Sequence, residues 1–159
     1  MTDHNIPIRA LSLITDGVMG GRSSGTLTHE TVQGREAVRM RGTVSLENDG
    51  GFIQMAADLN TDGSPLDASN FNGIEVTATG NGETYNFHLR TSNITRPWQS
   101  YRQSFIAGST WETHRIPFTD FAPHRIEAPL DITTLQRIGI LGIGRVFEAD
   151  ISISELRFY

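Results

Sequence analysis

The chain alternates apolar and polar residues at every second position over much of its length. Residues 84–91 are the clearest case. Tyr85, Phe87 and Leu89 fall on one face of this segment, and polar residues occupy the positions between them. Successive side chains of a strand point to opposite faces, so this pattern predicts β-strands with one buried face. Strands are predicted at residues 8–14, 24–30, 36–46, 51–58, 73–79, 84–91, 100–107, 111–117, 135–143 and 149–159.

Turn residues separate these segments, and helical periodicity is nearly absent. Gly80-Asn81-Gly82 is typical of a tight hairpin, because glycine and asparagine tolerate the positive φ that such turns need. One short helix is predicted at residues 131–135, where Asp131 can cap the first turn. About nine or ten antiparallel strands with at most one or two short helices predict an all-β sandwich or jelly roll. We expect one domain over residues 1–159.

The composition excludes several kinds of chemistry. There is no cysteine, and all 13 basic residues are arginine. Thiolate nucleophiles, cysteine-ligated metals and lysine Schiff bases are therefore ruled out. The net charge of −5 argues against nucleic-acid binding. The first ten residues do not read as a signal or transit peptide, and no apolar run is long enough to span a membrane. We expect a cytoplasmic protein without a cofactor.

Two short motifs are candidates for a catalytic site and a metal site. Residues 21–25 match the G-x-S-x-G pattern of serine hydrolases around Ser23. That motif requires a helix after the serine, whereas a strand is predicted here, so a glycine-rich loop is the favoured interpretation. Asp58, Asn60 and Asp62 copy the first half of a calcium-binding loop. The second half lacks the glutamate ligand, which favours a solvated turn over a calcium site.

A third group of residues has the chemistry of a ligand-binding face. His88 and Arg90 share the polar face of strand 84–91, and Trp98, Tyr101 and Arg102 follow in the next loop and strand. An aromatic ring can stack on a sugar, and arginine can hold a carboxylate or phosphate. The face therefore fits a carbohydrate or a small anionic ligand. The alternative is an ordinary hydrated sheet face with Trp98 tucked into the edge of the core.

The order of several motifs resembles one family. Residues 15–25 read T-D-G-V-M-G-G-R-S-S-G and resemble the D-G-V-M-G-G-x-S-x-G signature of complex I intermediate-associated protein 30. Further matches follow in order at residues 42–46, 50–52, 71–74, 80–85, 98–101 and 116–121. The resemblance covers about residues 11–159. It implies a galactose-binding-like β-sandwich without catalysis, which acts as an assembly factor or chaperone through a protein partner.

The signature loop itself has two interpretations. Its glycines permit unusual backbone geometry, and Asp16 can bind backbone amides, which suggests a structural role. Alternatively, the loop contacts a partner or ligand, with Arg22 and Ser23 at its tip. The predicted loop residues are Asp16, Gly17, Val18, Met19, Gly20, Gly21, Arg22 and Ser23. The leading hypothesis is thus a non-catalytic assembly module, and the alternative is a module that binds a carbohydrate or small polar ligand.

Overall fold

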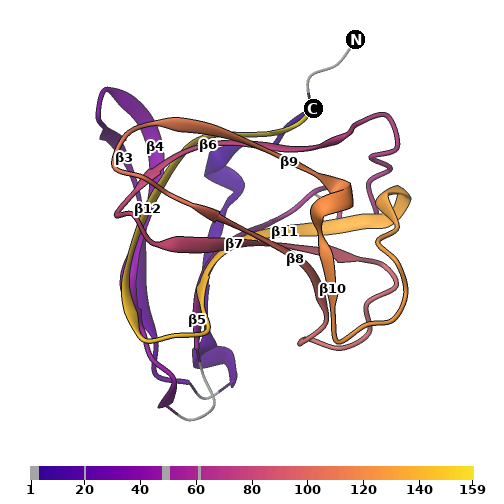
Figure 1. Ribbon diagram of the computed structural model, residues 1–159, viewed down its shortest axis with the longest axis horizontal. Helices are drawn as coiled ribbons and strands as arrows, with labels where there is room; N and C mark the ends of the chain where they lie inside the picture. The colour runs from indigo at the N-terminus through magenta and orange to yellow at the C-terminus, as the bar shows by residue number, and fades with distance from the viewer. Residues whose placement is uncertain (1–3, 20, 48–50, 61) are drawn as a thin grey trace.

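Two antiparallel β-sheets pack face to face in the computed structural model, which describes residues 4–19, 21–47, 51–60 and 62–159 (Figure 1). Sheet A has the order β3 (Ser24–Val32), β4 (Arg35–Val44), β12 (Phe147–Phe158), β6 (Gly73–Gly80) and β9 (Glu112–Pro117), and β1 (His4–Asn5) also pairs with β12. Sheet B has the order β10 (Ala122–His124), β8 (Ser100–Ile106), β7 (Thr84–Thr91), β11 (Leu135–Ile143), β5 (Phe52–Asp58) and β2 (Ser12–Thr15). The predicted all-β sandwich is confirmed.

Helical structure is limited to single 3₁₀ turns in the described part of the chain. These include η1 (Ile8–Ala10), η2 (Asp16–Met19), η4 (Phe118–Asp120) and η5 (Ile132–Thr134). The predicted cap at η5 is confirmed, because the Asp131 carboxylate accepts a hydrogen bond from the Thr133 amide at 3.0 Å. None of the helices in the described ranges is long and apolar enough to cross a membrane.

The core lies between the sheets and follows the predicted alternation. On β7, Tyr85, Phe87 and Leu89 are completely buried. The strand predictions for β7 and β11 match the observed bounds, whereas strand 36–46 ends early. Leu46 was predicted to point inward, but it lies beyond the last residue of β4 and is 48% exposed. Once the chain leaves the sheet, the alternation no longer determines the direction of a side chain.

Strand β12 departs from strict alternation at one point. Ile151 and Ile153 are buried, and so is Leu156, although it lies three positions further on. The register against β6 shifts between Ile153 and Glu155, which marks a β-bulge. The extra residue changes the phase of the strand by one, so Leu156 returns to the core side.

The N-terminal segment corrects one prediction. Residues 8–14 were predicted as a strand, but Ile8–Ala10 form η1 and β2 begins only at Ser12. The Ala10 amide donates to the Pro7 carbonyl at 2.9 Å, and the Leu11 amide donates to the Ile8 carbonyl at 3.2 Å. These local bonds turn the chain before it can enter sheet B.

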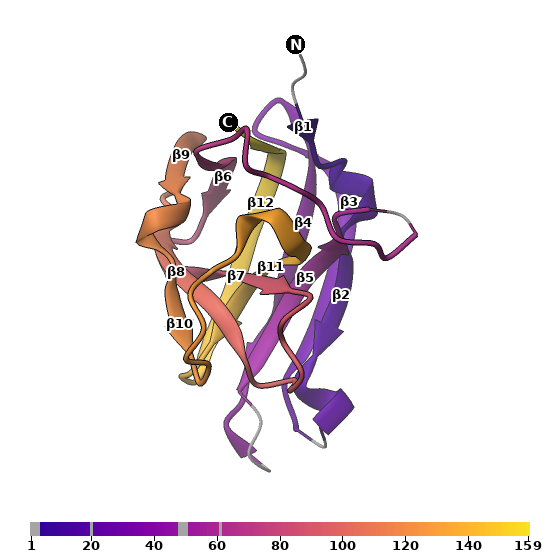
Figure 2. The same cartoon turned by 90° about the vertical axis from the view of Figure 1, so that its right-hand side faces the viewer.

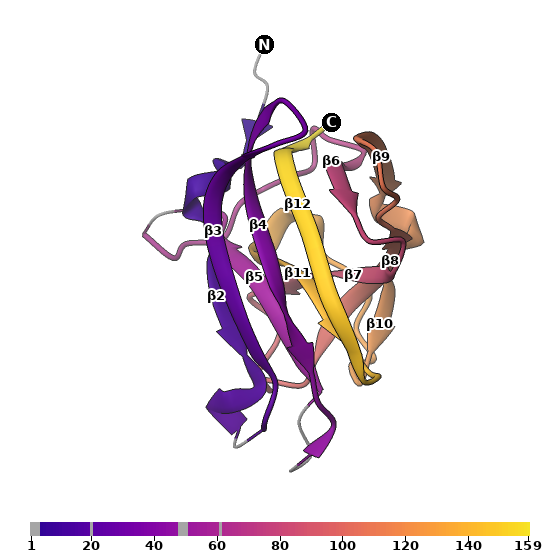
Figure 3. The same cartoon turned by 90° about the vertical axis from the view of Figure 1, so that its left-hand side faces the viewer.

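Sheet B is strongly curved. In Figure 1, β7 and β11 cross the middle of the molecule, while β10 and the pair β5 and β2 descend on opposite sides. Figure 2 views sheet B from in front, and Figure 3 views sheet A with sheet B behind it. Sheet A therefore covers the convex side of sheet B, and the concave side of sheet B is left facing outward.

Candidate functional site

The strand register places one set of side chains on the concave face of sheet B. Leu89 and Phe87 point into the core, so His88 between them points outward from β7. His88 lies opposite Arg102 on β8 and opposite Gly139 on β11. Paired residues of neighbouring strands share a face. The concave face therefore carries a row of residues drawn from strands that are distant in sequence.

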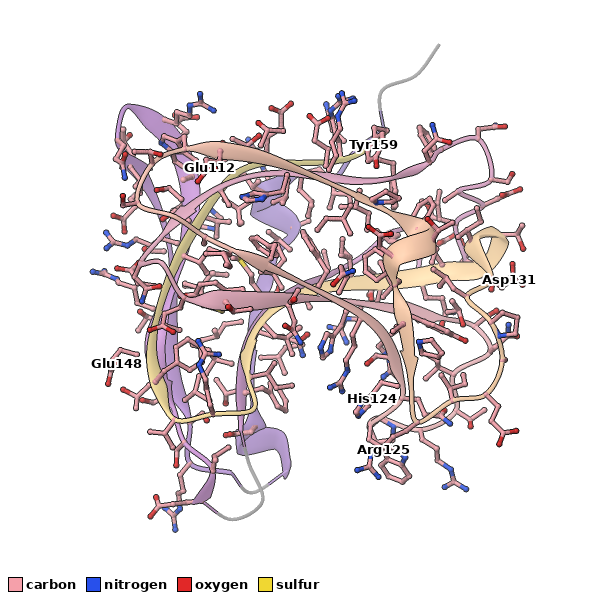
Figure 4. All side chains as sticks on the ribbon, in the orientation of Figure 1. Glu112, His124, Arg125, Asp131, Glu148 and Tyr159 are labelled. Atoms are coloured by element: carbon pink, nitrogen blue, oxygen red, sulfur yellow. The ribbon has the colours of Figure 1, made fainter. Side chains whose placement is uncertain are left out.

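These residues line a groove of about 570 Å³. Its lining comprises Ile14, Phe52, Gln54, His88, Arg90, Pro97, Trp98, Ser100, Arg102, Arg137, Gly139, Leu141 and Ile143. The part over β8 and β7 is polar and basic, and the part over β5 and β2 is largely apolar. Figure 4 shows His124 of β10 beside the polar end of this concave side. Four of the five predicted ligand-face residues line the groove: His88, Arg90, Trp98 and Arg102.

Tyr101 is the exception, and the prediction for it is wrong. Its side chain is completely buried on the core side of β8, opposite Leu89. Its hydroxyl donates a hydrogen bond to the Ala128 carbonyl at 2.7 Å. Burial raises the pKa of the Tyr101 hydroxyl, so it remains a neutral donor. The alternation of β8 makes Arg102 and Tyr101 point in opposite directions, so the two cannot serve one face.

Arg90 organises the loop that carries Trp98. Its guanidinium donates to the carbonyl oxygens of Pro97 at 3.1 Å and Gln99 at 2.9 Å, and more weakly to that of Arg96 at 3.4 Å. Burial, assisted by the charge of Arg137, lowers the pKa of Arg90. The side chain of Trp98 is 54% exposed. The alternative in which Trp98 tucks into the core edge is thus wrong, because its loop is held over the groove.

His88 forms the centre of the groove floor. It is only 9% exposed, and its Nε2 is buried without a hydrogen-bond partner in the described structure. Burial, followed by the charges of Arg102, His124 and Arg90, lowers the pKa of His88 to about 3. The imidazole is therefore neutral at physiological pH, and its buried Nε2 has no hydrogen-bond partner in the described structure.

Arg137 and the apolar half of the groove were not identified from the sequence. Arg137 lies opposite Arg90, and its Nε has no hydrogen-bond partner in the described structure. The nearest carboxylate oxygen, Oδ1 of Asp58, lies 3.7 Å away, which is an ion-pair contact too long for a hydrogen bond. The alternation of residues 135–143 signals that Arg137 is outward, but only the pairing of β11 with β7 brings it beside Arg90.

Glycines in β11 allow neighbouring side chains to approach closely. A Cβ on Gly139 would lie 2.4 Å from Oε1 of Gln54, and one on Gly142 would lie 2.8 Å from the ring of Phe147. This confirms that the glycine-rich run 139–144 belongs mainly to a strand whose glycines accept neighbours, not to a nucleotide-binding turn. Gly139 also keeps the groove floor low beside His88.

The signature loop lies away from the groove floor and is tied together by Asp16. The buried Asp16 carboxylate accepts hydrogen bonds from the Ser23 amide at 2.9 Å and the Ser23 hydroxyl at 2.5 Å. It also accepts from the amides of Gly51 at 2.6 Å and Phe52 at 3.2 Å. Burial alone would raise the pKa of Asp16, but these hydrogen bonds outweigh it and hold the pKa below its usual value.

The other loop residues have distinct positions. Gly17, Val18 and Met19 complete η2, and Gly20 lies outside the described residues. Gly21 leaves no room for a side chain, because a Cβ there would lie 2.4 Å from Cγ of Asp16. Arg22 is exposed. The observed contacts of Asp16, Gly21 and Ser23 are structural.

Ser23 does not have the surroundings of a hydrolase nucleophile. Its hydroxyl donates to Asp16, lies 3.1 Å from the Ser45 carbonyl and accepts from the Ser45 amide at 2.8 Å. No histidine of the described structure hydrogen-bonds to it, and the strand β3 follows instead of a helix. The nucleophile elbow requires a basic partner and a strand–turn–helix setting, and both are lacking around this serine.

The calcium candidate residues have other partners. Asp62 accepts from the Ser64 hydroxyl at 2.6 Å, and the amide nitrogen of Asn60 donates to the Pro65 carbonyl at 3.0 Å. Asp58 faces Arg137. These contacts describe a turn closed by its own side chains, which agrees with the solvated-turn interpretation.

The two-sheet sandwich is similar in fold to solved carbohydrate-binding modules. A family 11 carbohydrate-binding module from Clostridium thermocellum, in complex with a β-1,3-1,4-mixed-linked tetrasaccharide, superposes with a TM-score of 0.76 at 14% identity. That match covers 98% of this chain and 94% of the other. A family 30 module of a Clostridium thermocellum cellulosomal cellulase gives a TM-score of 0.68 at 16% identity, with 100% and 98% covered.

The chain belongs to the family of complex I intermediate-associated protein 30, whose model matches residues 3–152. This confirms the resemblance read from the signature. No curated protein matches the chain.

Proposed function

We propose that this chain is a single-domain, non-catalytic binding module that holds an extended carbohydrate in the concave groove of sheet B. The observation that carries the proposal is the exposed ring of Trp98, which is held over a groove where the buried Nε2 of His88 and Nε of Arg137 have no described hydrogen-bond partner. Such an arrangement offers a stacking surface for a sugar ring together with hydrogen-bonding groups for its hydroxyls.

The shape of the groove favours an extended ligand over a small one. Its lining runs from β8 across β7, β11 and β5 to β2. Neighbouring strands lie about 4.8 Å apart, so this path is roughly 19 Å long. A chain of sugars lying across the strands would meet Trp98 near one end and Phe52 near the other. The apolar faces of the sugars would cover the apolar half of the groove.

The similarity to carbohydrate-binding modules supports this proposal at the level of the fold. The family 11 module in the comparison was solved with a bound tetrasaccharide. At 14% identity the likeness concerns the fold, so the ligand of this chain must come from its own groove residues. We assign no catalytic residue and no cofactor, because binding in this groove requires neither.

Replacing Trp98 with alanine tests the proposal. We expect Trp98→Ala to weaken binding of an oligosaccharide by about tenfold or more, because a stacked aromatic contributes roughly 1–3 kcal/mol. The melting temperature should change little, since the ring is already more than half exposed. Titration calorimetry with neutral and acidic oligosaccharides measures the effect, and Trp111→Phe outside the groove is the matched aromatic control. Binding that survives Trp98→Ala unchanged would place the ligand elsewhere.

A protein partner at the signature loop is the second candidate function. It is favoured by membership of a family named for association with complex I intermediates. It is also favoured by exposed apolar residues, of which Leu46 follows the Ser45 whose amide hydrogen-bonds to Ser23 of the loop. Leu46 is 48% exposed and Val146 is 68% exposed. Arg22 is exposed on the loop itself. Isolated apolar residues are common on surfaces, so this surface carries less weight than the groove.

A capture experiment distinguishes the two candidate functions. Arg22→Glu should abolish recovery of a protein partner if the signature loop is the contact, and should leave oligosaccharide binding unchanged. Trp98→Ala should have the opposite effect. Partner recovery that is equal for the wild type and Arg22→Glu would exclude this loop as the docking surface.

A further inference from the structure

The groove is basic in a chain that is acidic as a whole. Among its described lining residues are Arg90, Arg102 and Arg137, and neither aspartate nor glutamate lines it. The chain has 18 acidic residues and a net charge of −5, so the groove has the opposite sign to the rest of the molecule. Asp58 approaches Arg137 from the edge with a side chain that is 60% exposed. Screening by water weakens that contact, and the groove keeps its positive potential.

The three arginines are not equivalent. Arg90 is occupied by the carbonyl groups of residues 96, 97 and 99. Arg102 uses its Nε to donate to the Ser100 hydroxyl at 2.8 Å, and its terminal nitrogens form no hydrogen bond with described residues. Arg137 has a buried Nε without a hydrogen-bond partner in the described structure, and this Nε forms a 3.7 Å ion pair with Asp58. Arg102 and Arg137 therefore retain donors for a ligand, whereas Arg90 is a positioning residue.

His88 completes the unpaired set. It lies on β7, between the strands that carry Arg102 and Arg137, and its Nε2 is buried without a described partner. Buried polar atoms in folded proteins almost always have a hydrogen-bond partner, so a buried atom without one indicates that a partner is missing from the structure. The buried nitrogens without a partner lie on the adjacent strands β7 and β11, and the terminal nitrogens of Arg102 lie on β8 beside them. Their arrangement points to a ligand as the source of the missing hydrogen-bond partners.

We propose that the groove binds a glycan carrying anionic substituents, either carboxylate or sulfate, with Arg102 and Arg137 holding the charged group and His88 hydrogen-bonded to the same sugar. This inference rests on the proposed function and specifies its ligand class. A guanidinium presents planar paired donors that match the oxygens of a carboxylate or sulfate, and charge-assisted hydrogen bonds are about twice as strong as neutral ones. A neutral glycan would leave both arginine charges uncompensated as the groove loses water.

The electrostatics of the groove agree with an anionic ligand. Burial lowers the pKa of both Arg90 and Arg102, and the neighbouring charges of Arg137 and Arg125 respectively add to the effect. In this groove, burial and neighbouring positive charge thus both disfavour the charged forms of Arg90 and Arg102. An anionic substituent bound close to the groove arginines would offset that penalty.

The same groove fits a glycan better than an acidic peptide. Strands β7, β11 and β5, which form its floor, are paired on both sides within sheet B. An extended peptide would find no free backbone edge there to extend the sheet, which is the usual source of its affinity. A glycan needs no such edge, because its hydroxyls and ring faces bind side chains, and Trp98 offers the stacking surface.

Calorimetric titration of the intact chain with four probes tests the inference. The probes are a galacturonate tetrasaccharide, a sulfated oligosaccharide of similar length, the neutral mixed-linked β-glucan tetrasaccharide and an oligoglutamate peptide. We expect at least one acidic oligosaccharide to bind about tenfold or more tighter than the neutral one, and its affinity to fall between low salt and about 0.15 M ionic strength. The preferred acidic arm tells carboxylate from sulfate.

Variants of the groove arginines test whether these residues cause the preference for acidic oligosaccharides. Arg102→Gln and Arg137→Gln should each weaken the acidic oligosaccharide by about tenfold, and should change the neutral one by less than about twofold. Arg9→Gln removes the same charge from an exposed site outside the groove and should change neither. If a glutamine variant folds poorly, the imidazole resonances of His88 in the wild type provide a second measurement, since they should move on titration with the galacturonate tetrasaccharide.

The outcomes distinguish this inference from the proposed function beneath it. Equal affinity for neutral and acidic oligosaccharides, lost in Trp98→Ala but not in the arginine variants, would overturn the anionic specificity and leave the carbohydrate function standing. Preference for oligoglutamate over both acidic oligosaccharides would overturn the glycan assignment. Absence of binding by every probe would overturn both proposals.

Discussion

Two polar clusters in this molecule are both candidate contact sites in the sequence, and they differ in the structure by how their hydrogen-bonding groups are satisfied. Around Asp16, a buried carboxylate receives four hydrogen bonds from Ser23, Gly51 and Phe52. Around His88, the buried Nε2 of His88 on β7 and the buried Nε of Arg137 on β11 lack hydrogen-bond partners in the described structure. The Asp16 carboxylate forms its hydrogen bonds with other parts of the fold. The cluster around His88 retains hydrogen-bonding groups that a ligand could use. The comparison teaches that a specific motif can serve the fold alone, whereas unsatisfied polar groups in a groove make it a candidate binding site.

Removing the Asp16 carboxylate should have the largest effect on stability. Asp16→Ala leaves the amides of Ser23, Gly51 and Phe52 and the Ser23 hydroxyl without their acceptor in a buried place. Each unsatisfied donor costs about 1–3 kcal/mol, so we expect a loss of roughly 4 kcal/mol or more in the free energy of unfolding. Urea denaturation measures this. Asp131→Ala, at an exposed cap, is the control and should cost about 1 kcal/mol. Equal losses would mean that the Asp16 cluster is not special.

The two clusters should also lose their contributions to stability over different pH ranges. The pKa of His88 is about 3 in the folded protein and about 6.5 when unfolded, so the unfolded chain binds a proton first as the pH falls. Stability should therefore decrease from about pH 6.5 downward, by on the order of 3 kcal/mol at pH 4. The pKa of Asp16 is also lowered, so its stabilisation is present above its unfolded value of 3.8 and is lost as the pH falls through the folded value.

Urea denaturation at a series of pH values checks this separation. His88→Gln should flatten the upper part of the profile and leave the steep loss below about pH 4. His124, whose pKa is lowered by burial and by Arg102 and Arg125, remains in both proteins and cancels in the comparison. An unchanged slope between pH 6.5 and pH 4 in His88→Gln would show that the imidazole is not held neutral by its burial.

The smallest expected effects concern two glycines. A Cβ at Gly21 would meet the fixed Asp16 carboxyl group, whereas one at Gly139 would meet the flexible end of Gln54. We expect Gly21→Ala to cost about 2 kcal/mol and Gly139→Ala less than about 1 kcal/mol. Gly139→Ala should instead weaken ligand binding in the groove, because it raises the floor beside His88. Thermal unfolding and calorimetric titration of both variants check the contrast, and a larger stability loss for Gly139→Ala would reverse it.

Several parts of the site could be recognised in advance, because they are local. The alternation of residues 84–91 predicts that His88 and Arg90 share a face, and the same period correctly separates them from Phe87 and Leu89. Tyr101 was misplaced because it was grouped with Arg102 by proximity in the sequence, although adjacent residues of a strand point apart. Arg137 was missed because its neighbours in the groove lie about 35 to 50 residues earlier in the chain.

The alternative interpretations of the motifs could be separated only by their contacts. The signature loop was compatible with both a structural and a contact role, and the hydrogen bonds of Asp16 assign its buried part to the fold. Trp98 could be buried or exposed, and the three carbonyl groups held by Arg90 keep its loop over the groove. The cytoplasmic location and the identity of a protein partner stay predictions, to be tested by localisation and by the capture experiment.

The sequence by itself determined the all-β class, the core positions of the central strands and the family, because side-chain alternation and motif order are properties of the chain. Only the tertiary structure decided that sheet B is concave, that Arg102, His88 and Arg137 line one groove on it, and that Nε2 of His88 and Nε of Arg137 have no hydrogen-bond partner in the described structure. The physical reason is that strand order and curvature arise from pairing between distant segments. Whether a polar group is satisfied depends on neighbours that the chain brings together only when it folds.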